Sequence, residues 1–138
     1  MEEINMEILP TPIRELLAYA TSASKIDEEY KLYQGKENRK LFGYKQAEQF
    51  VGCIGVEWTT DNTCIIKQIA VSPSERGRGI GEGMIDFIID NHSLSRISAE
   101  TDQDAVDFYK KMGFTITNLG EKYPGVVRFC CEFRRIEK

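Results

Sequence analysis

The feature that most constrains this sequence is a cluster of glycines directly after a strongly apolar stretch. Residues 64–71 (CIIKQIAV) are mostly apolar, which is typical of a central strand covered on both faces. Four glycines follow within seven positions, at Gly77, Gly79, Gly81 and Gly83. Apolar residues then recur with the spacing of one helix face, at Ile80, Met84, Phe87 and Ile88. The sequence therefore predicts a strand, a glycine-rich loop and a helix that ends near residue 90.

Two common phosphate-binding motifs do not account for these glycines. A Walker P-loop needs a lysine after its last glycine, and none of the four is followed by one. The dinucleotide pattern G-x-G-x-x-G fails from each start, because its last position falls on Glu82, Met84 or Asp86. A surface loop does not explain glycines that continue into an apolar helix, where each costs roughly 1 kcal/mol relative to alanine.

A glycine-rich main chain at the start of a helix can bind an anion. Glycines let successive N–H groups point the same way, and the helix N-terminus adds a partial positive charge. Arg76 and Arg78 add full charges. We therefore predict a pyrophosphate site over residues 76–81.

The rest of the chain predicts one mixed α/β domain over residues 1–138, with antiparallel strands first and βα units behind. Thr101-Asp102-Gln103-Asp104 fits a helix start. Residues 7–9 are the only candidate for a strand before the first helix, and residues 120–125 are predicted to form a loop. Helices are expected over residues 13–20, 27–32, 80–90 and 101–112, and strands over 40–45, 49–58, 64–71, 96–100, 114–118 and 126–133.

Composition excludes several classes of protein. The net charge of −4 and the pI of about 5.1 argue against a general nucleic-acid binder, which usually carries a basic surface. No apolar stretch approaches the roughly 18 residues that cross a bilayer, so no membrane association is expected. The acidic first seven residues lack the order of a signal peptide, and we expect a cytoplasmic protein.

The cysteines do not predict a metal site. Cys53, Cys64, Cys130 and Cys131 form no C-x-x-C pair, and His92 is the only histidine. All four lie in apolar, strand-like runs, where a free thiol behaves as a small hydrophobic group. We predict buried structural thiols and no metal.

Two segments resemble the GNAT superfamily of N-acetyltransferases. Arg76-Gly77-Arg78-Gly79-Ile80-Gly81 matches its (Q/R)-x-x-G-x-(G/A) signature, and the preceding Gln68-Ile69-Ala70-Val71 looks like the end of its central strand. Residues 104–114 (DAVDFYKKMGF) resemble its second element, A-x-x-x-Y-x-x-x-G-F. The two motifs lie about 28 residues apart with one strand between them, and the resemblance covers residues 40–133.

The resemblance implies the GNAT acyl-CoA N-acyltransferase fold and acetyl-CoA as co-substrate. Main-chain groups of the strand end Ile69-Ala70-Val71 would pair with the pantetheine arm on a splayed sheet. The pyrophosphate would be held by Arg76, Gly77, Arg78, Gly79, Ile80 and Gly81. Asp102 stands where the family often has an asparagine that touches CoA, so that contact departs from the pattern.

The resemblance also implies catalytic groups. Tyr109 would be the general acid that protonates the leaving thiolate. A main-chain N–H of the central strand can stabilise the oxyanion. The family often uses a glutamate of that strand as the base, but residues 64–68 hold no carboxylate. Glu57 and Glu100 on neighbouring strands are candidates, and water or a second substrate group could serve instead.

The expected function is acetyl-CoA-dependent N-acetyl transfer to a primary amine by direct attack on the thioester. The alternatives are a catalytically silent GNAT-fold module that binds acyl-CoA, and a structural domain whose loop binds nothing. The acceptor could be a small molecule or a protein amine. Residues 1–30 hold seven acidic side chains against two basic ones, so we expect a cationic acceptor, tested by neutralising Glu28 and Glu29. A homodimer is left open.

Overall fold

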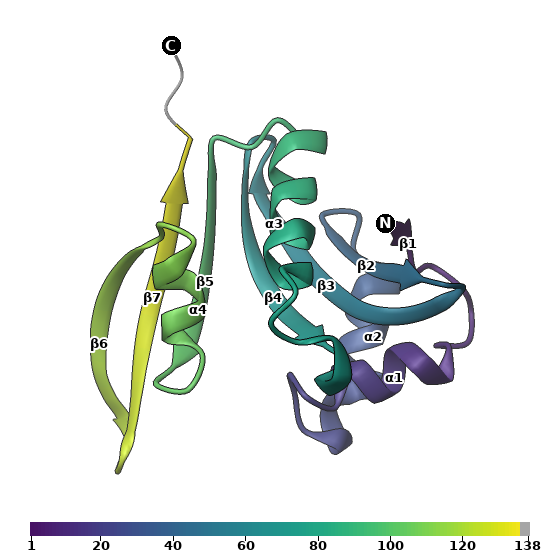
Figure 1. Ribbon diagram of the computed structural model, residues 1–138, viewed down its shortest axis with the longest axis horizontal. Coiled ribbons are helices and arrows are strands. Elements are labelled where there is room, and N and C mark those ends of the chain that lie inside the picture. Colours follow the sequence, from purple (N-terminus) through teal and green to yellow (C-terminus); the bar gives the residue numbers. More distant parts are fainter. Residues whose placement is uncertain (136–138) are drawn as a thin grey trace.

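The computed structural model describes residues 1–135 as seven strands and four α-helices (Figure 1). The strands form one mixed sheet in the order β1-β2-β3-β4-β5-β7-β6. Within the described residues, no helix combines the length and the apolar character needed to cross a membrane. The elements are β1 (Glu2–Glu3), α1 (Thr11–Leu17), α2 (Ile26–Gly35), β2 (Arg39–Gln46), β3 (Gln49–Thr60), β4 (Thr63–Val71), α3 (Ile80–Asn91), β5 (Arg96–Asp102), α4 (Val106–Lys111), β6 (Thr115–Tyr123) and β7 (Val126–Arg134).

The first half of the sheet, β1 to β4, is antiparallel and covered on both faces (Figure 1). Helices α1 and α2 pack on one face, in a buried cluster that includes Ile13, Leu17 and Tyr33. Helix α3 packs on the other face through Met84, Ile85 and Ile88. Strand β4 is therefore buried between two layers, as its apolar sequence predicts.

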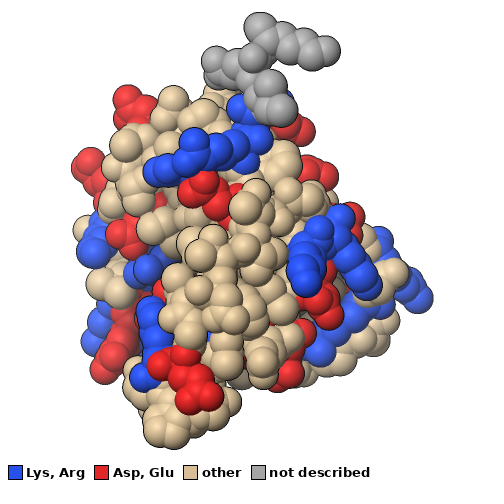
Figure 2. All heavy atoms as spheres, turned by 90° about the vertical axis from the view of Figure 1, so that its left-hand side faces the viewer, with Lys and Arg blue, Asp and Glu red and all other residues tan. Residues whose placement is uncertain are grey.

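The second half of the sheet, β5-β7-β6, is antiparallel and covered by a helix on one face (Figure 1). Helix α4 packs on β6 and β7. Along β6 nearly every residue is exposed, and Leu119, Tyr123 and Val126 are exposed apolar residues of the β6–β7 hairpin. Figure 2 faces this side of the molecule and shows a broad uncharged area bordered by basic and acidic side chains.

The two halves meet along a short parallel seam. Residues 63–66 of β4 pair with residues 96–99 of β5, and beyond Ile66 and Ala99 the two strands separate. This confirms the predicted mixed sheet that splays at its centre.

Three local predictions were wrong. The first strand is Glu2–Glu3, which pairs with β2, and residues 7–9 form no strand. Thr101 belongs to β5, and it is Asp102 Oδ1 that accepts the N–H groups of residues 104 and 105 before α4. Residues 120–123 extend β6, because bulges near Gly120 and Tyr123 keep the hairpin paired.

The predicted burial is confirmed for three of the four cysteines. Cys53, Cys64 and Cys131 are buried, while Cys130 on the opposite face of β7 is partly exposed. Burial raises the pKa of Cys53 and Cys64 to about 12 and that of Cys131 to about 11, so these thiols stay protonated at neutral pH.

Candidate active site

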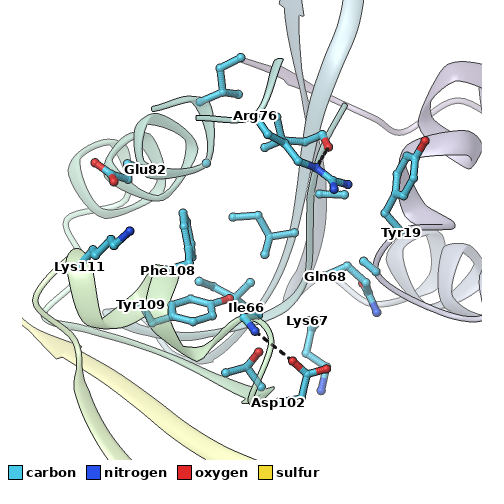
Figure 3. A pocket seen from close by; sticks show the side chains of 18 of the residues that line it. Tyr19, Ile66, Lys67, Gln68, Arg76, Glu82, Asp102, Phe108, Tyr109 and Lys111 are labelled. Carbon is cyan, nitrogen blue, oxygen red and sulfur yellow. Dashed lines mark hydrogen bonds between the residues drawn. The ribbon is translucent and has the colours of Figure 1, made fainter. Parts of the chain in front are cut away.

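The separating ends of β4 and β5 open a cleft of about 750 Å³. Its walls come from β4, the glycine-rich loop, the start of α3, the end of β5 and α4. Figure 3 shows Phe108 and Tyr109, from α4, on one side of the cleft and Tyr19 and Gln68 on the other. Most residues of the predicted site line it: Ile69, Ala70, Val71, Arg76, Gly77, Gly79, Ile80, Gly81, Glu100, Asp102 and Tyr109.

The β4 main chain is free to bind along this cleft. The Ser72 N–H donates to the Val51 carbonyl of β3 at 2.7 Å, and the register is antiparallel. Hydrogen-bonded pairs alternate along such a ladder, so the main-chain groups of Ile69 and Val71 point away from β3, into the cleft. Arg76 Nε donates to the Val71 carbonyl at 3.0 Å, so one of these acceptors already has a partner.

The glycine loop has a conformation that its glycines permit. Gly77 and Gly79 have φ of 82° and 80°, in the left-handed region where a side chain is strained. Gly79 is the N-cap of α3, so the free N–H groups of the first helical turn face the cleft end. A Cβ on Gly81 would lie 3.0 Å from the Phe108 ring, so this glycine lets α3 and α4 approach closely.

Arg78 departs from the prediction. Its side chain is exposed and pairs with Glu75 at 3.2 Å, and it does not line the cleft. Arg76 does line it, where its guanidinium lies 5.0 Å from the centroid of the Tyr19 ring.

A bulge on β4 decides which side chains face which helix. Gly55 pairs with Gln68 and Val56 with Ile66, so Lys67 has no partner on β3. The extra residue shifts the alternation of the strand. Before the bulge Ile66 packs toward α3, and after it Gln68 and Ala70 face α1 and α2.

Tyr109 is buried at the wall of the cleft. Its ring lies between Phe108 and Phe114, with centroid distances of 5.1 and 5.2 Å. Burial raises the pKa of Tyr109 well above its usual range. The phenol is therefore neutral at working pH and retains a proton that it can donate.

The two candidate bases are both paired with cations. Glu100 lies on the cleft wall, where a hydrogen bond from Lys122 at 3.0 Å lowers its pKa, helped by Arg128 at 3.3 Å. Glu57 does not line the cleft, although its carboxylate lies 4.0 Å from Lys67 and 3.8 Å from Arg39.

Sequence reasoning missed several residues that line the cleft. Lys67 and Gln68 precede Ile69-Ala70-Val71, the strand end that was expected to bind the co-substrate. The faces on which their side chains lie follow from the bulge, which the sequence does not mark. Tyr19 and Arg128 come from distant parts of the chain. The sequence offered one indication that Phe108 lies at the cleft, because it directly precedes Tyr109 in the second motif. Its place on an apolar helix face predicted only core packing.

A splayed sheet with a glycine loop at its opening and a helix bearing a buried tyrosine opposite is the arrangement that the sequence resemblance implies. The chain belongs to the acetyltransferase (GNAT) domain family, whose domain it matches over residues 37–116. It is 36% identical over 66 residues to an uncharacterized N-acetyltransferase of Bacillus methanolicus. That match covers 48% of this chain and about half (55%) of the relative.

Solved structures share the fold over nearly the whole chain. A GNAT family acetyltransferase from Elizabethkingia anophelis with acetyl-CoA bound has a TM-score of 0.73 at 18% identity, over 97% of this chain and 96% of that one. An aminoglycoside 6'-N-acetyltransferase complexed with coenzyme A has a TM-score of 0.75 at 14% identity, over 100% of this chain and 99% of that one. The ribosomal-protein-S18-alanine N-acetyltransferase of Escherichia coli has a TM-score of 0.70 at 18% identity, over 91% of this chain and 90% of that one.

Proposed function

We propose that this protein is an acetyl-CoA-dependent N-acetyltransferase that transfers the acetyl group to a primary amine by direct attack on the thioester. The observation that carries the proposal is that one cleft brings together the glycine loop, an unpaired stretch of β4 main chain and the buried Tyr109. Each of these serves a different part of the same co-substrate.

The cleft suits acetyl-CoA along its length. The N–H groups at the start of α3 and the Arg76 guanidinium would hold the pyrophosphate. The main-chain groups of Ile69 and Val71 would pair with the pantetheine amides, as an added strand pairs with a sheet edge. The Val71 carbonyl is shared with Arg76, so the pantetheine competes with that side chain there.

The chemistry needs a donor for the oxyanion and a proton for the leaving group. The amine nitrogen attacks the thioester carbon, the C–N bond forms and the C–S bond breaks. The main-chain N–H at the Lys67 bulge is a candidate donor to the oxyanion, since Lys67 lines the cleft and has no paired residue on β3. Tyr109 gives its proton to the thiolate of CoA and regains one from solvent.

Removal of the amine proton is the weakest part of the site. Glu100 is at the cleft, but its paired cations lower its pKa and make it a poor base. Glu57 would act through water, past Lys67. We therefore propose that the fraction of free amine limits the rate, so kcat/KM should rise with pH toward the amine pKa near 10.

The acidic N-terminal region gives little support to a cationic acceptor. Four of its seven carboxylates are paired with basic side chains, at Glu2, Glu3, Asp27 and Glu29. Glu28 and Glu29 are therefore not equivalent, because Glu29 pairs with the buried Arg39. Neutralising both would disturb the fold as well as the charge.

The function is tested by measuring release of the CoA thiol from acetyl-CoA with a panel of primary amines. Tyr109→Phe should lower kcat about 100-fold, because it removes the general acid, and leave the Kd for CoA unchanged. The exposed Tyr123→Phe is the matched control, with no change expected.

The same measurements address the alternative of a silent acyl-CoA-binding module. That module would bind CoA and release no thiol with any amine. Failure to bind CoA at all would refute both functions.

A further inference from the structure

The cleft opens on a second face of the sheet that the co-substrate groups do not use. Gln68 faces the α1–α2 side, and so does Glu100, because its neighbour Ala99 is buried toward α3 and α4. Arg128 lies on the same side, since it alternates with the buried Cys131 along β7. All three line the cleft and form what we call the α2-side opening.

Gln68 is nine-tenths buried at this opening, with its amide held in one orientation. Its residue exposure is 7%, and the Tyr33 hydroxyl donates to its Oε1. Burial raises the pKa of Tyr33, although the charge and hydrogen bond of Arg39 oppose the rise, so the phenol keeps its proton. Gln68 Oε1 has no hydrogen to donate, so Tyr33 is the donor in this hydrogen bond.

The Gln68 Nε2 group is therefore left for the cleft. Within residues 1–135 no hydrogen bond occupies it, while its oxygen is taken by Tyr33. An amide N–H₂ is a donor alone, so the group that it meets must offer a lone pair, such as an oxygen.

The layer behind Tyr33 is built to keep this orientation. Arg39, 4% exposed, lies 4.4 Å from the centroid of the Tyr33 ring and pairs with Glu29 and Glu57. A Cβ on Gly55 would fall on the Tyr33 hydroxyl, so only glycine leaves room for it. Three elements (α2, β2 and β3) thus converge to fix one side-chain amide of β4.

The charges around the opening add to this donor. Arg128 and Lys122 share the single carboxylate of Glu100, and Lys67 lies 4.0 Å from Glu57, which already contacts Arg39. Asp102, two residues after Glu100 on the same face of β5, is a further carboxylate, so three cations and three carboxylates surround the opening. A carboxylate beside Gln68 would have Lys67 and Arg128 as its basic neighbours at the cleft wall, and these two side chains carry the charge part of the argument.

We propose that Gln68 is the residue with which this protein selects its acceptor, and that the acceptor is an amine that carries a carboxylate, as an amino acid does. Gln68 Nε2 donates to that carboxylate, Arg128 and Lys67 supply the charge, and the amine is directed at the thioester. Tyr33 is a positioning residue for the amide. The inference rests on the proposed N-acetyl transfer and names its substrate class.

The experiment compares matched acceptors that share one side chain. L-lysine, L-lysinamide and 1,5-diaminopentane differ in that the α-carbon bears a carboxylate, a neutral carbonyl or neither, and a second trio built on L-phenylalanine repeats the series. Initial rates of CoA release should give kcat/KM in the order acid, amide, amine, with at least about 10-fold between the first and the last. Rates are compared at equal concentrations of free amine, which removes the difference in amine pKa.

Variants then assign the preference to Gln68. Gln68→Glu replaces the donor by a carboxylate and should reverse the order, while Gln68→Ala should abolish it. Tyr33→Phe should raise KM for the acid at unchanged Kd for CoA, because the amide is no longer oriented. Gln49→Glu, on an exposed residue at the start of β3, is the charge-matched control.

Each outcome decides something. If amines are acetylated with no preference for the acid, or if Gln68→Glu keeps the wild-type order, the inference is overturned and the proposed function stands. If CoA binds and no amine is acetylated, the proposed function fails and this inference fails with it. A thermal melt of each variant shows whether it is folded, and Gln68→Asn provides a milder change should the alanine variant unfold.

Discussion

The two halves of the sheet differ in how much of them the helices cover. In β1–β4, α1 and α2 seal one face and α3 the other, and even an arginine, Arg39, is buried among ion pairs. In β5-β7-β6, α4 covers one face, and the charges of the opposite face remain partly exposed. The first half is therefore packed on both faces, and the second leaves the charged side chains of one face partly exposed.

The cleft lies between β4 and β5, where the fully covered half of the sheet meets the half that is covered on one face. Only four residue pairs join β4 to β5, and one buried cluster beneath α3 and α4 spans both halves. The seam thus places a strand that is packed from both sides beside a wall whose charged side chains are partly exposed.

The comparison predicts that replacing Arg39 in the first half lowers the stability of the protein far more than replacing Arg128 in the second. Arg39→Leu should lower the free energy of unfolding by about 3 kcal/mol, because it leaves Glu29 without its buried partner. Arg128→Leu in the second half should cost less than about 1 kcal/mol, since its pair with Glu100 is partly exposed. Urea unfolding of both variants measures this, and equal losses would contradict the division between the halves.

A smaller effect is expected at the glycine loop of the seam. Gly79→Ala places a side chain at φ of 80° and should cost about 1–2 kcal/mol, seen as weaker CoA binding or lower stability. Gly83→Ala is the matched control inside α3, where a Cβ meets no atom within 4 Å. That change should stabilise the helix by up to about 1 kcal/mol. Calorimetric titration with CoA and urea unfolding separate the two contributions.

The smallest effect concerns the charges of the second half. The folded pKa of Glu100 is lowered, so its pairs stabilise the protein above the unfolded pKa near 4.3, and this stability is lost as the pH falls through the folded value. Glu100→Gln should therefore cost under about 1 kcal/mol at pH 7, after screening of a partly exposed pair. The difference in unfolding free energy between the variant and the wild type should vanish in acid. A difference that grows below pH 4 would contradict the stabilising role of the Glu100 ion pairs.

The sequence predicted the strand, loop and helix of the seam because local signals suffice there. The glycines, the apolar period of α3 and the motif around Tyr109 are each contained within a few residues. The contact of Tyr33 with Gln68 joins residues 35 apart, and the bulge at Lys67 has no marker in the chain. The first strand was misplaced because two charged residues, Glu2 and Glu3, carry no strand signal and pair only through the main chain of β2.

The bulge has a consequence for how such chains are compared and inherited. Because Lys67 is one residue beyond what the β3 ladder accommodates, the side chains after it occupy the opposite faces from those that a regular strand would give. Loss of that single codon would make the ladder regular and leave Gln68 and Ile69 on their present faces, whereas retaining Lys67 without the bulge would exchange the two faces. An alignment with a relative that lacks the extra residue must place its gap at Lys67, because a gap one position away would match Gln68 to a residue of the opposite face, however similar the two sequences look.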